Sequence, residues 1–143
     1  MCIRDSATIA LIDIDHFKQI NDTHGHIVGD TVLRQLSLEL RRNLRDNDLA
    51  GRYGGDEFCV ILPQMSLEKA AQRMERLRET FCNYRIPHLP ELRVSLSIGL
   101  ADFQPVYDDA ASWLNAADRA LYAAKHTGRN RVCVNTDSLA RSA

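Results

Sequence analysis

The pattern of apolar and polar positions predicts strands and helices along most of the chain. An almost wholly apolar, β-branched run over residues 8–15 is typical of a central strand that is buried on both faces. Two shorter apolar runs, over 49–53 and 58–63, flank a Gly-Gly pair and predict a β-hairpin, because glycine easily adopts the positive φ of a tight turn. Strict alternation over 94–100 predicts a half-buried antiparallel strand, and residues 131–134 predict a last strand.

Apolar residues at helical spacing predict three amphipathic helices. The first begins at Asp30, which is a good N-cap candidate, and the others cover 66–81 and about 109–126. Residues 16–20 predict only a short helical turn. The segment 21–29 is rich in Asn, Asp and Gly and predicts a loop.

This order of elements predicts an α+β fold of the ferredoxin-like or nucleotidyl-cyclase-like kind. We expect a mainly antiparallel central sheet with the helices packed on one face. The 143 residues, of which 45% are hydrophobic and 26% charged, predict one domain with a core over about 7–135 and a frayed C-terminal tail.

Composition excludes some classes of partner. The net charge of −1 gives no electrostatic basis for binding nucleic acid or a membrane surface. The four cysteines form no CxxC motif, and Cys59 and Cys133 fall in predicted strands, as small core residues do in a reducing compartment. Since no signal-like or membrane-spanning run occurs, we expect a cytoplasmic location, although a longer parent protein could be anchored upstream.

Two pairs of carboxylates carry the candidate chemistry. Asp13 and Asp15 end the first strand on one face, and Asp56 and Glu57 follow the glycine turn. If the hairpin lies beside the first strand, Asp13 and Asp56 converge, and their hard oxygens favour Mg²⁺ or Mn²⁺ over zinc. The simpler interpretations are a solvated hairpin tip and an Asp13 that caps the following turn.

The segment after the first strand offers further polar groups. A strand-to-helix junction has free backbone N–H groups that suit phosphate oxygens, and Lys18 adds a positive charge there. His24 and His26 raise the question of a metal, but a surface or hydrogen-bonding role is the favoured interpretation for two histidines so spaced in a loop.

Several motifs resemble the GGDEF domain of bacterial diguanylate cyclases, in the same order and at plausible spacing over about residues 9–134. They are Asp13-Ile14-Asp15-His16-Phe17-Lys18, Ile20-Asn21-Asp22, Gly25-His26, Gly29-Asp30, Arg52-Tyr53-Gly54-Gly55-Asp56-Glu57-Phe58, Ser97-Ile98-Gly99, Ala117-Asp118, Ala120-Leu121-Tyr122, Ala124-Lys125 and Gly128-Arg129-Asn130. The resemblance implies the family's reaction, which makes cyclic di-guanylate (c-di-GMP) and pyrophosphate from two GTP molecules. In that reaction the 3′-hydroxyl of one GTP attacks the α-phosphorus of the other, assisted by Mg²⁺ or Mn²⁺.

The resemblance also implies roles for single residues. The metal ligands would be Asp13, the carbonyl of Ile14, and Asp56. The substrate-binding residues would be Phe17, Lys18, Asn21, Asp30, Gly54, Gly55, Lys125 and Arg129. Of these, Asn21 and Asp30 would bind guanine, and Lys125 and Arg129 would clamp the terminal phosphates. Asp56, Glu57, Lys125 and Arg129 would form the catalytic set, in which Glu57 assists deprotonation of the hydroxyl or contacts a second metal.

Two further features follow from the resemblance. Because one domain holds one GTP, catalysis implies a symmetric homodimer. The family also carries an inhibitory site for its product, written Arg-x-x-Asp, which Arg45 and Asp48 would form with Arg76 in support. Without the resemblance, Arg45 is equally an arginine that a helix dipole favours at a C-terminus.

The sequence departs from the family pattern at two places. The Asp-x-Leu-Thr-x-Leu-x-Asn-Arg pattern that precedes the first strand in the family is absent, so we expect the chain to be part of a longer protein. His24 stands where an aromatic residue is usual.

Two other functions remain possible. One is a catalytically inactive module that binds GTP or cyclic di-GMP, which the intact acidic and cationic residues disfavour. The other is an unrelated metal-dependent nucleotidyltransferase, which the guanine-binding pair Asn21 and Asp30 disfavours.

Overall fold

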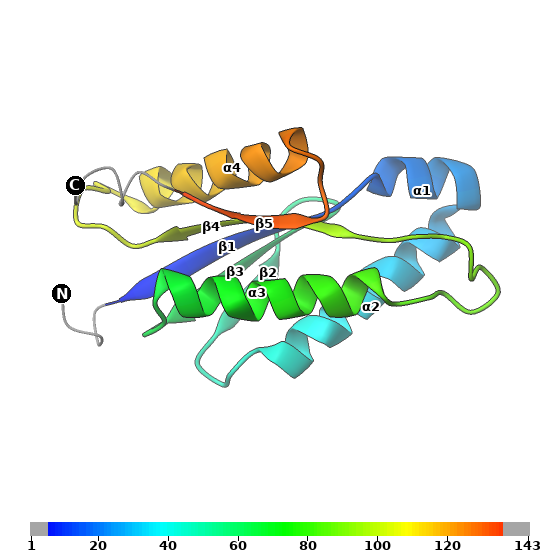
Figure 1. Cartoon of the computed structure of the whole chain (residues 1–143), viewed down its shortest axis with the longest axis horizontal. Coiled ribbons are helices and arrows are strands. Elements are labelled where there is room, and N and C mark those ends of the chain that lie inside the picture. The colour runs from blue at the N-terminus through cyan, green and yellow to red at the C-terminus, as the bar shows by residue number, and fades with distance from the viewer. Residues whose placement is uncertain (1–5, 136–143) are drawn as a thin grey trace.

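A computed structural model describes residues 6–135, which form five strands and four helices (Figure 1). In chain order they are β1 (Ala7–Ile14), α1 (Phe17–His24), α2 (His26–Asn43), β2 (Leu49–Arg52), β3 (Glu57–Pro63), α3 (Leu67–Cys82), β4 (Leu96–Asp102), α4 (Ala110–His126) and β5 (Arg131–Val134). The tail predicted to be frayed and Cys2 lie outside the described residues.

The strands form one sheet in the order β2-β3-β1-β4-β5. β1 lies at the centre and is antiparallel to both β3 and β4, β2 is antiparallel to β3, and only β5 runs parallel to its neighbour, β4. The predicted α+β fold with a mainly antiparallel sheet is therefore confirmed. β1 is buried over all but its first residue, as its apolar sequence predicts.

The helices cover both faces of the sheet, so the prediction that they pack on one face was wrong. Ala10, Ile12 and Ile14 of β1 pack with α2 and α3, whereas Ile9 and Leu11 pack with α4. Figure 1 shows α4 on the opposite side of the sheet from α3. The physical reason lies in β1, because a strand that is apolar at odd and even positions needs cover on both sides.

β4 also differs from its prediction as a half-buried strand. It begins at Leu96, and every residue before Asp102 is buried, because α3 packs on one face and α4 on the other. Gly99 allows the close approach of α4. A Cβ at this position would lie 2.2 Å from the backbone nitrogen of Leu121 and 2.4 Å from the carbonyl oxygen of Ala117.

The segment 21–29 is helical, not a loop. α1 and α2 meet at Gly25, whose φ of 91° breaks the helix between them. Asp30 therefore lies inside α2, and the N-cap position belongs to Gly25. Both helices bury apolar side chains in the larger core cluster, and this packing outweighs the loop-like composition.

Other local predictions are confirmed. Ser66 caps α3 by accepting a hydrogen bond from the N–H of Lys69. Cys59 and Cys133 lie in strands and are half-buried, with free thiols. Within residues 6–135, none of the helices has the length and apolar character needed to cross a bilayer.

Candidate functional site

Acidic side chains meet where β1 ends beside the β2–β3 turn. Asp13 lies opposite Glu57 in the antiparallel β1–β3 register, so both side chains share the face that α4 covers. The N–H of Ile14 donates to the carbonyl of Asp56 at 3.3 Å, and the Asp56 carboxyl group interacts directly with that of Asp13. The structure thus brings Asp13 and Asp56 together at one end of the central strand.

The last turn of α4 brings positive charge to the same place. Lys125 forms an ion pair with Asp13. A pocket of about 210 Å³ opens here, lined by Asp13, Ile14, Asp15, His16, Phe17, Lys18, Asp56, Lys125 and Arg129. Except for Asp15 and His16, all of these were singled out from the sequence as ligands of a metal or of phosphates.

The surroundings of Asp13 shift the pKa of its carboxyl group. Burial raises its pKa to about 7, the ion pair with Lys125 opposes that rise, and the nearby Asp56 adds to it. The Oδ1 atom of Asp13 is buried and has no hydrogen-bond partner. Burial tends to lower the pKa of Lys125, but its hydrogen bond to Asp13 and the charges of Asp13, Glu57 and Asp56 outweigh burial and raise it.

The donor set of the pocket fits a hard divalent cation. Asp13 and Asp56 offer adjacent carboxylates beside the backbone of Ile14, and a cation would satisfy the unpartnered Oδ1 of Asp13. No group of three or more His, Cys, Asp or Glu side chains is placed to hold a metal within residues 6–135, so His24 and His26 belong to no such group. Two carboxylates suit Mg²⁺, which usually keeps waters and binds substrate phosphates as well.

The start of α1 forms one wall of the pocket. His16 turns the chain between β1 and α1 in the left-handed conformation, with φ 57°, and its side chain makes no capping hydrogen bond. The N–H groups of a first helical turn lack partners within the helix and suit phosphate oxygens. Phe17 and Lys18 line the pocket at this turn, where the exposed Lys18 adds positive charge.

The predicted guanine-binding residues lie at the α1–α2 junction, outside the pocket lining. The Oδ1 atom of Asn21 is buried without a partner, and a Cβ on Gly29 would lie 1.8 Å from it. Asn21 therefore packs closely against the residue that precedes the exposed Asp30. One turn of α1 separates this junction from the pocket wall at Phe17 and Lys18.

The glycine turn is exposed at the tip of the hairpin. Gly54 has a φ of 89°, as a tight turn requires, and the Arg52 guanidinium holds the turn by donating to the Gly55 carbonyl at 3.0 Å. Neither glycine lines the pocket. Glu57 is half-buried on the pocket side of the sheet and also lies outside the lining.

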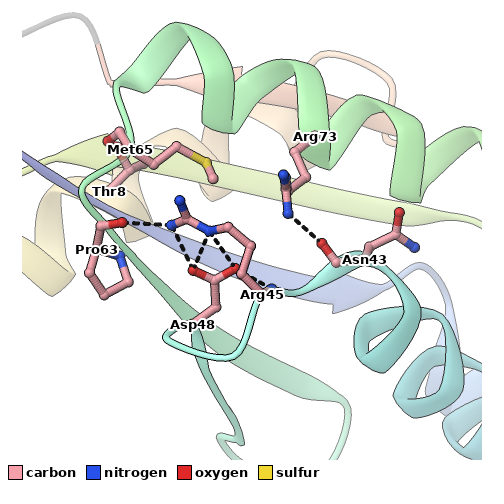
Figure 2. Close-up of polar contacts among 7 residues, drawn as sticks. All are labelled: Thr8, Asn43, Arg45, Asp48, Pro63, Met65 and Arg73. Atoms are coloured by element: carbon pink, nitrogen blue, oxygen red, sulfur yellow. Dashed lines mark hydrogen bonds and ion pairs between the residues drawn. The ribbon is translucent and has the colours of Figure 1, made fainter.

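The residues predicted for an inhibitory site lie at a second pocket, near the start of α3. Figure 2 shows Arg45 beside Asp48, with an Nη2–Oδ1 distance of 2.8 Å, and donating to the Pro63 carbonyl at 2.6 Å. The Asp48 side chain is fully buried and also accepts the backbone N–H of Arg45. The pocket, of about 340 Å³, is lined by Arg45, Gln64, Met65, Lys69, Gln72, Arg73 and Arg76. Arg45 and Arg76 thus line the same basic pocket. Asp48 is not part of the lining, but its hydrogen bonds hold the Arg45 side chain in place.

One cluster beside the pocket at the end of β1 was not foreseen. The Asp15 carboxylate accepts hydrogen bonds from the hydroxyls of Ser95 and Ser97, both at 2.6 Å, and from the N–H of Asn130 at 3.0 Å. Asp13 and Asp15 therefore share a strand but differ in surroundings. The sequence signal was the pair of serines at i and i+2 in an otherwise apolar run, where hydroxyls that are withdrawn from water need acceptors.

Comparison with known families and curated proteins gives consistent results. Residues 3–131 match the family model described as "Diguanylate cyclase, GGDEF domain". The probable diguanylate cyclase DgcC of Escherichia coli is 46% identical over 125 residues, which are 87% of this chain and 34% of that protein. The response regulator PleD of Caulobacter vibrioides is 44% identical over 131 residues, 90% of this chain and 29% of PleD. The chain thus spans about a third of the length of these relatives.

Solved structures show the same similarity. The active GGEEF domain of a diguanylate cyclase from Vibrio cholerae superposes with a TM-score of 0.86 at 34% identity, covering 93% of this chain and 85% of that one. The coiled coil and GGDEF domain of DgcB from Caulobacter crescentus, solved in complex with c-di-GMP, gives a TM-score of 0.85 at 34% identity, covering 91% and 70%.

Proposed function

Because this chain belongs to the GGDEF domain family of diguanylate cyclases, we propose that it condenses two GTP molecules into cyclic di-GMP and pyrophosphate. One observation carries the proposal: the carboxylates of Asp13 and Asp56 meet Lys125 and Arg129 in one pocket beside the first turn of α1. Acidic groups for a metal and cationic groups for phosphates, side by side, suit the transfer of a nucleotidyl group.

The base of GTP would bind at the α1–α2 junction. Guanine presents N1–H and N2–H donors on its Watson–Crick edge, and these suit the carboxylate of Asp30 and the amide oxygen of Asn21. The unpartnered Oδ1 of Asn21 supports this assignment, because a buried acceptor without a donor is unfavourable in the free protein. The glycine turn at 54–55 would allow close approach of the nucleotide to the hairpin.

The phosphates would lie along the wall that joins α1 to the end of α4. Backbone N–H groups at Phe17 and Lys18 would bind phosphate oxygens, while Lys125 and Arg129 would hold the terminal phosphates and favour departure of pyrophosphate. Asp13, the carbonyl of Ile14, and Asp56 would hold Mg²⁺ or Mn²⁺. Bound there, the metal would supply neutralisation of the charge that develops on the reacting oxygens.

Each bond-forming step follows the same course. The 3′-oxygen of one GTP attacks the α-phosphorus of the other, the bond to the bridging oxygen of pyrophosphate breaks, and the hydroxyl proton is lost. Glu57 is half-buried on the face shared with Asp13, where it would accept that proton or contact a second metal. Two such steps close the ring and release two pyrophosphate molecules.

The reaction would need two copies of the chain. Each copy supplies one pocket with one set of acidic and cationic residues, so the two GTP molecules would meet across the two-fold axis of a homodimer. Product would bind in the second pocket, where Arg45 and Arg76 provide cations for the phosphates of cyclic di-GMP and Asp48 orients Arg45. Binding there would inhibit the enzyme.

The proposal is tested by incubating the purified protein with GTP and Mg²⁺ and separating the nucleotides by chromatography. Cyclic di-GMP and pyrophosphate, accumulating in a ratio of one to two, are the expected result. Saturable binding of GTP or cyclic di-GMP without turnover would instead identify a regulatory binding module. Turnover of other nucleoside triphosphates at equal rates would identify a less specific nucleotidyltransferase.

A further inference from the structure

The turn that carries Arg129 has an unusual backbone. Three consecutive residues after α4 have positive φ: Gly128 at 129°, Arg129 at 59° and Asn130 at 46°. Residues other than glycine rarely adopt this region, so a turn with two of them in succession needs contacts from outside to hold it. Besides such contacts, one local bond ties the turn to the end of α4, since the N–H of Arg129 donates to the Ala124 carbonyl at 2.9 Å.

Asn130 makes contacts in two directions. Its backbone N–H donates to Oδ2 of Asp15 at 3.0 Å, which ties the turn to the end of β1. Its side-chain Oδ1 accepts from Nη1 of Arg78 at 2.9 Å, and its Nδ2 lies 3.6 Å from Sγ of Cys82, so α3 holds the turn from the other side. Asn130 therefore joins the central strand to a helix on the far face of the sheet.

The two outer members of this network are themselves fixed. Asp15 is buried and also accepts the hydroxyls of Ser95 and Ser97, so both oxygens of its carboxylate have donors. Arg78 is only 15% exposed and pairs with Glu75 one turn earlier on α3. A network with all its members partnered is rigid, and a rigid network can fix the position of a neighbouring group.

From this network we propose that Asp15, Asn130 and Arg78 are positioning residues that hold Arg129 against the triphosphate. The inference rests on the proposed function, since it assigns these residues to the phosphate wall of that pocket. Arg129 lines the pocket, while the bonds that fix its place are made by its backbone and by Asn130. In the proposed function, none of these three side chains is assigned to the metal or to a phosphate.

The proposal gives different roles to Asp13 and Asp15, the two carboxylates at the end of β1. Asp13 keeps a buried Oδ1 without a hydrogen-bond partner, whereas the Asp15 carboxylate accepts three hydrogen bonds from β4, its preceding loop and the turn. Asp15 is also followed directly by His16, the left-handed residue that starts the α1 wall. The buried Asp15 carboxylate thus anchors the turn that carries Arg129, and Asp15 itself lies at the start of the other turn that borders the pocket.

The test uses Arg78→Met, because Arg78 lies on α3, does not line the pocket and contacts the turn through its hydrogen bond to Asn130. Its matched control is Arg42→Met, which removes an arginine paired at the same i,i+3 spacing with Glu39 on α2, far from the turn. We expect Arg78→Met to raise the KM for GTP by about tenfold with kcat within about twofold, and Arg42→Met to leave both unchanged. Melting temperatures of both variants establish that they are folded.

A double-mutant cycle with Arg129→Ala separates positioning from general structural support. If Arg78 acts through Arg129, Arg78→Met adds less than about a twofold change in KM when Arg129 is already alanine. Independent, additive losses, or equal effects of Arg78→Met and Arg42→Met, overturn the proposal. Should Arg78→Met fail to fold, Asn130→Gly removes the same hydrogen bond while keeping the positive φ and the N–H bond to Asp15, and it is expected to give the same result.

The two proposals fail in different ways. If the wild-type protein binds GTP but makes no cyclic di-GMP, the cyclase proposal is wrong. The same cycle, measured as the Kd of GTP in the presence of Mg²⁺, then still decides whether the network positions Arg129.

Discussion

Asp13 of the central strand and Lys125 of the last helix form an ion pair that joins the middle of the sheet to the C-terminal turn of α4. The pair uses Oδ2 of Asp13 and leaves Oδ1 buried and without a partner. The acidic and cationic residues of the pocket are therefore in contact without a ligand. A substitution among the acidic residues should alter the position or pKa of the cationic ones, and the reverse.

Replacing Asp56 with asparagine should abolish turnover. The substitution keeps the shape of the side chain but removes one of the two charges that face the proposed metal, and we expect at least about a 10²-fold fall in kcat. Pyrophosphate release at saturating GTP and Mg²⁺ measures it. Asp108→Asn, at an exposed loop position, is the charge-matched control. A rate for Asp56→Asn within a few-fold of the wild type would remove Asp56 from the metal site.

The metal-free protein should become less stable as the pH rises from about 5 to 7. Burial raises the pKa of Asp13 from 3.8 to about 7, so in this interval the folded chain keeps a proton that the unfolded chain releases. Stability that is present at low pH is therefore lost as the pH rises through the folded pKa, and the loss is complete above it. Thermal melts in EDTA across this range measure the effect.

The Asp13→Asn variant is the control for this prediction, because it cannot lose the proton. Its melting temperature should change less with pH than that of the wild type. Mg²⁺ should stabilise the wild type most at high pH, where Asp13 is charged, and should not do so for the variant. Identical pH profiles for the two proteins would show that Asp13 has an ordinary pKa.

Gly99→Ala should destabilise the fold by about 3 kcal/mol, because the new methyl group would meet the backbone of α4 at Leu121 and Ala117. A backbone cannot move aside as a side chain can, so α4 must shift and carry Lys125 with it. Chemical denaturation measures the free energy of unfolding. Gly51→Ala, in the exposed strand β2 with no atom within 4 Å of the added Cβ, should change that energy by less than about 0.5 kcal/mol.

Substitutions of the two arginines of the second pocket should have different effects on stability while both weaken inhibition by cyclic di-GMP. Arg76→Ala removes an exposed cation and should raise the inhibitory constant of cyclic di-GMP by about tenfold with an unchanged melting temperature. Arg45→Ala should relieve inhibition as well, but it also deprives the buried Asp48 of its guanidinium partner and should lose about 1–3 kcal/mol of stability. Initial rates should stay the same in both. Undiminished inhibition in either variant would remove its residue from the product site.

Turnover per chain should depend on protein concentration. If two copies must meet to join two GTP molecules, the specific activity rises with concentration and levels off once the dimer is formed. Initial rates over a hundredfold range of concentration, compared with the mass measured by light scattering, test this. A specific activity that is constant while the protein stays monomeric would contradict the dimeric mechanism.

Much of the fold follows from local pattern, and the errors in the predicted fold had different causes. The prediction of a doubly buried β1 was right, and it already contradicted the expectation that the helices lie on one face of the sheet. The loop predicted for residues 21–29 from their composition was wrong. Asn, Asp and Gly are common in loops, but here they lie on two helices whose apolar faces complete the core.

The candidate site, too, could be predicted only in part. The convergence of Asp13 with Asp56 was predicted on the condition that the hairpin lies beside the first strand, and the observed β1–β3 pairing meets that condition. The partners of Asp15 were not, since Ser95, Ser97 and Asn130 meet it only when β4 and β5 take their places in the sheet. Strand order is a long-range property, and no periodicity in one segment encodes it.

The pocket takes its acids from early in the chain and most of its cations from its last turn, at Lys125 and Arg129. On the ribosome, the sequence up to β4 would emerge with Asp13, Asp56 and Lys18 present and with Lys125 and Arg129 still untranslated. A nascent chain therefore cannot complete this pocket until residue 129 has been added, and a chain that ends before residue 125 would lack both of these cations and strand β5.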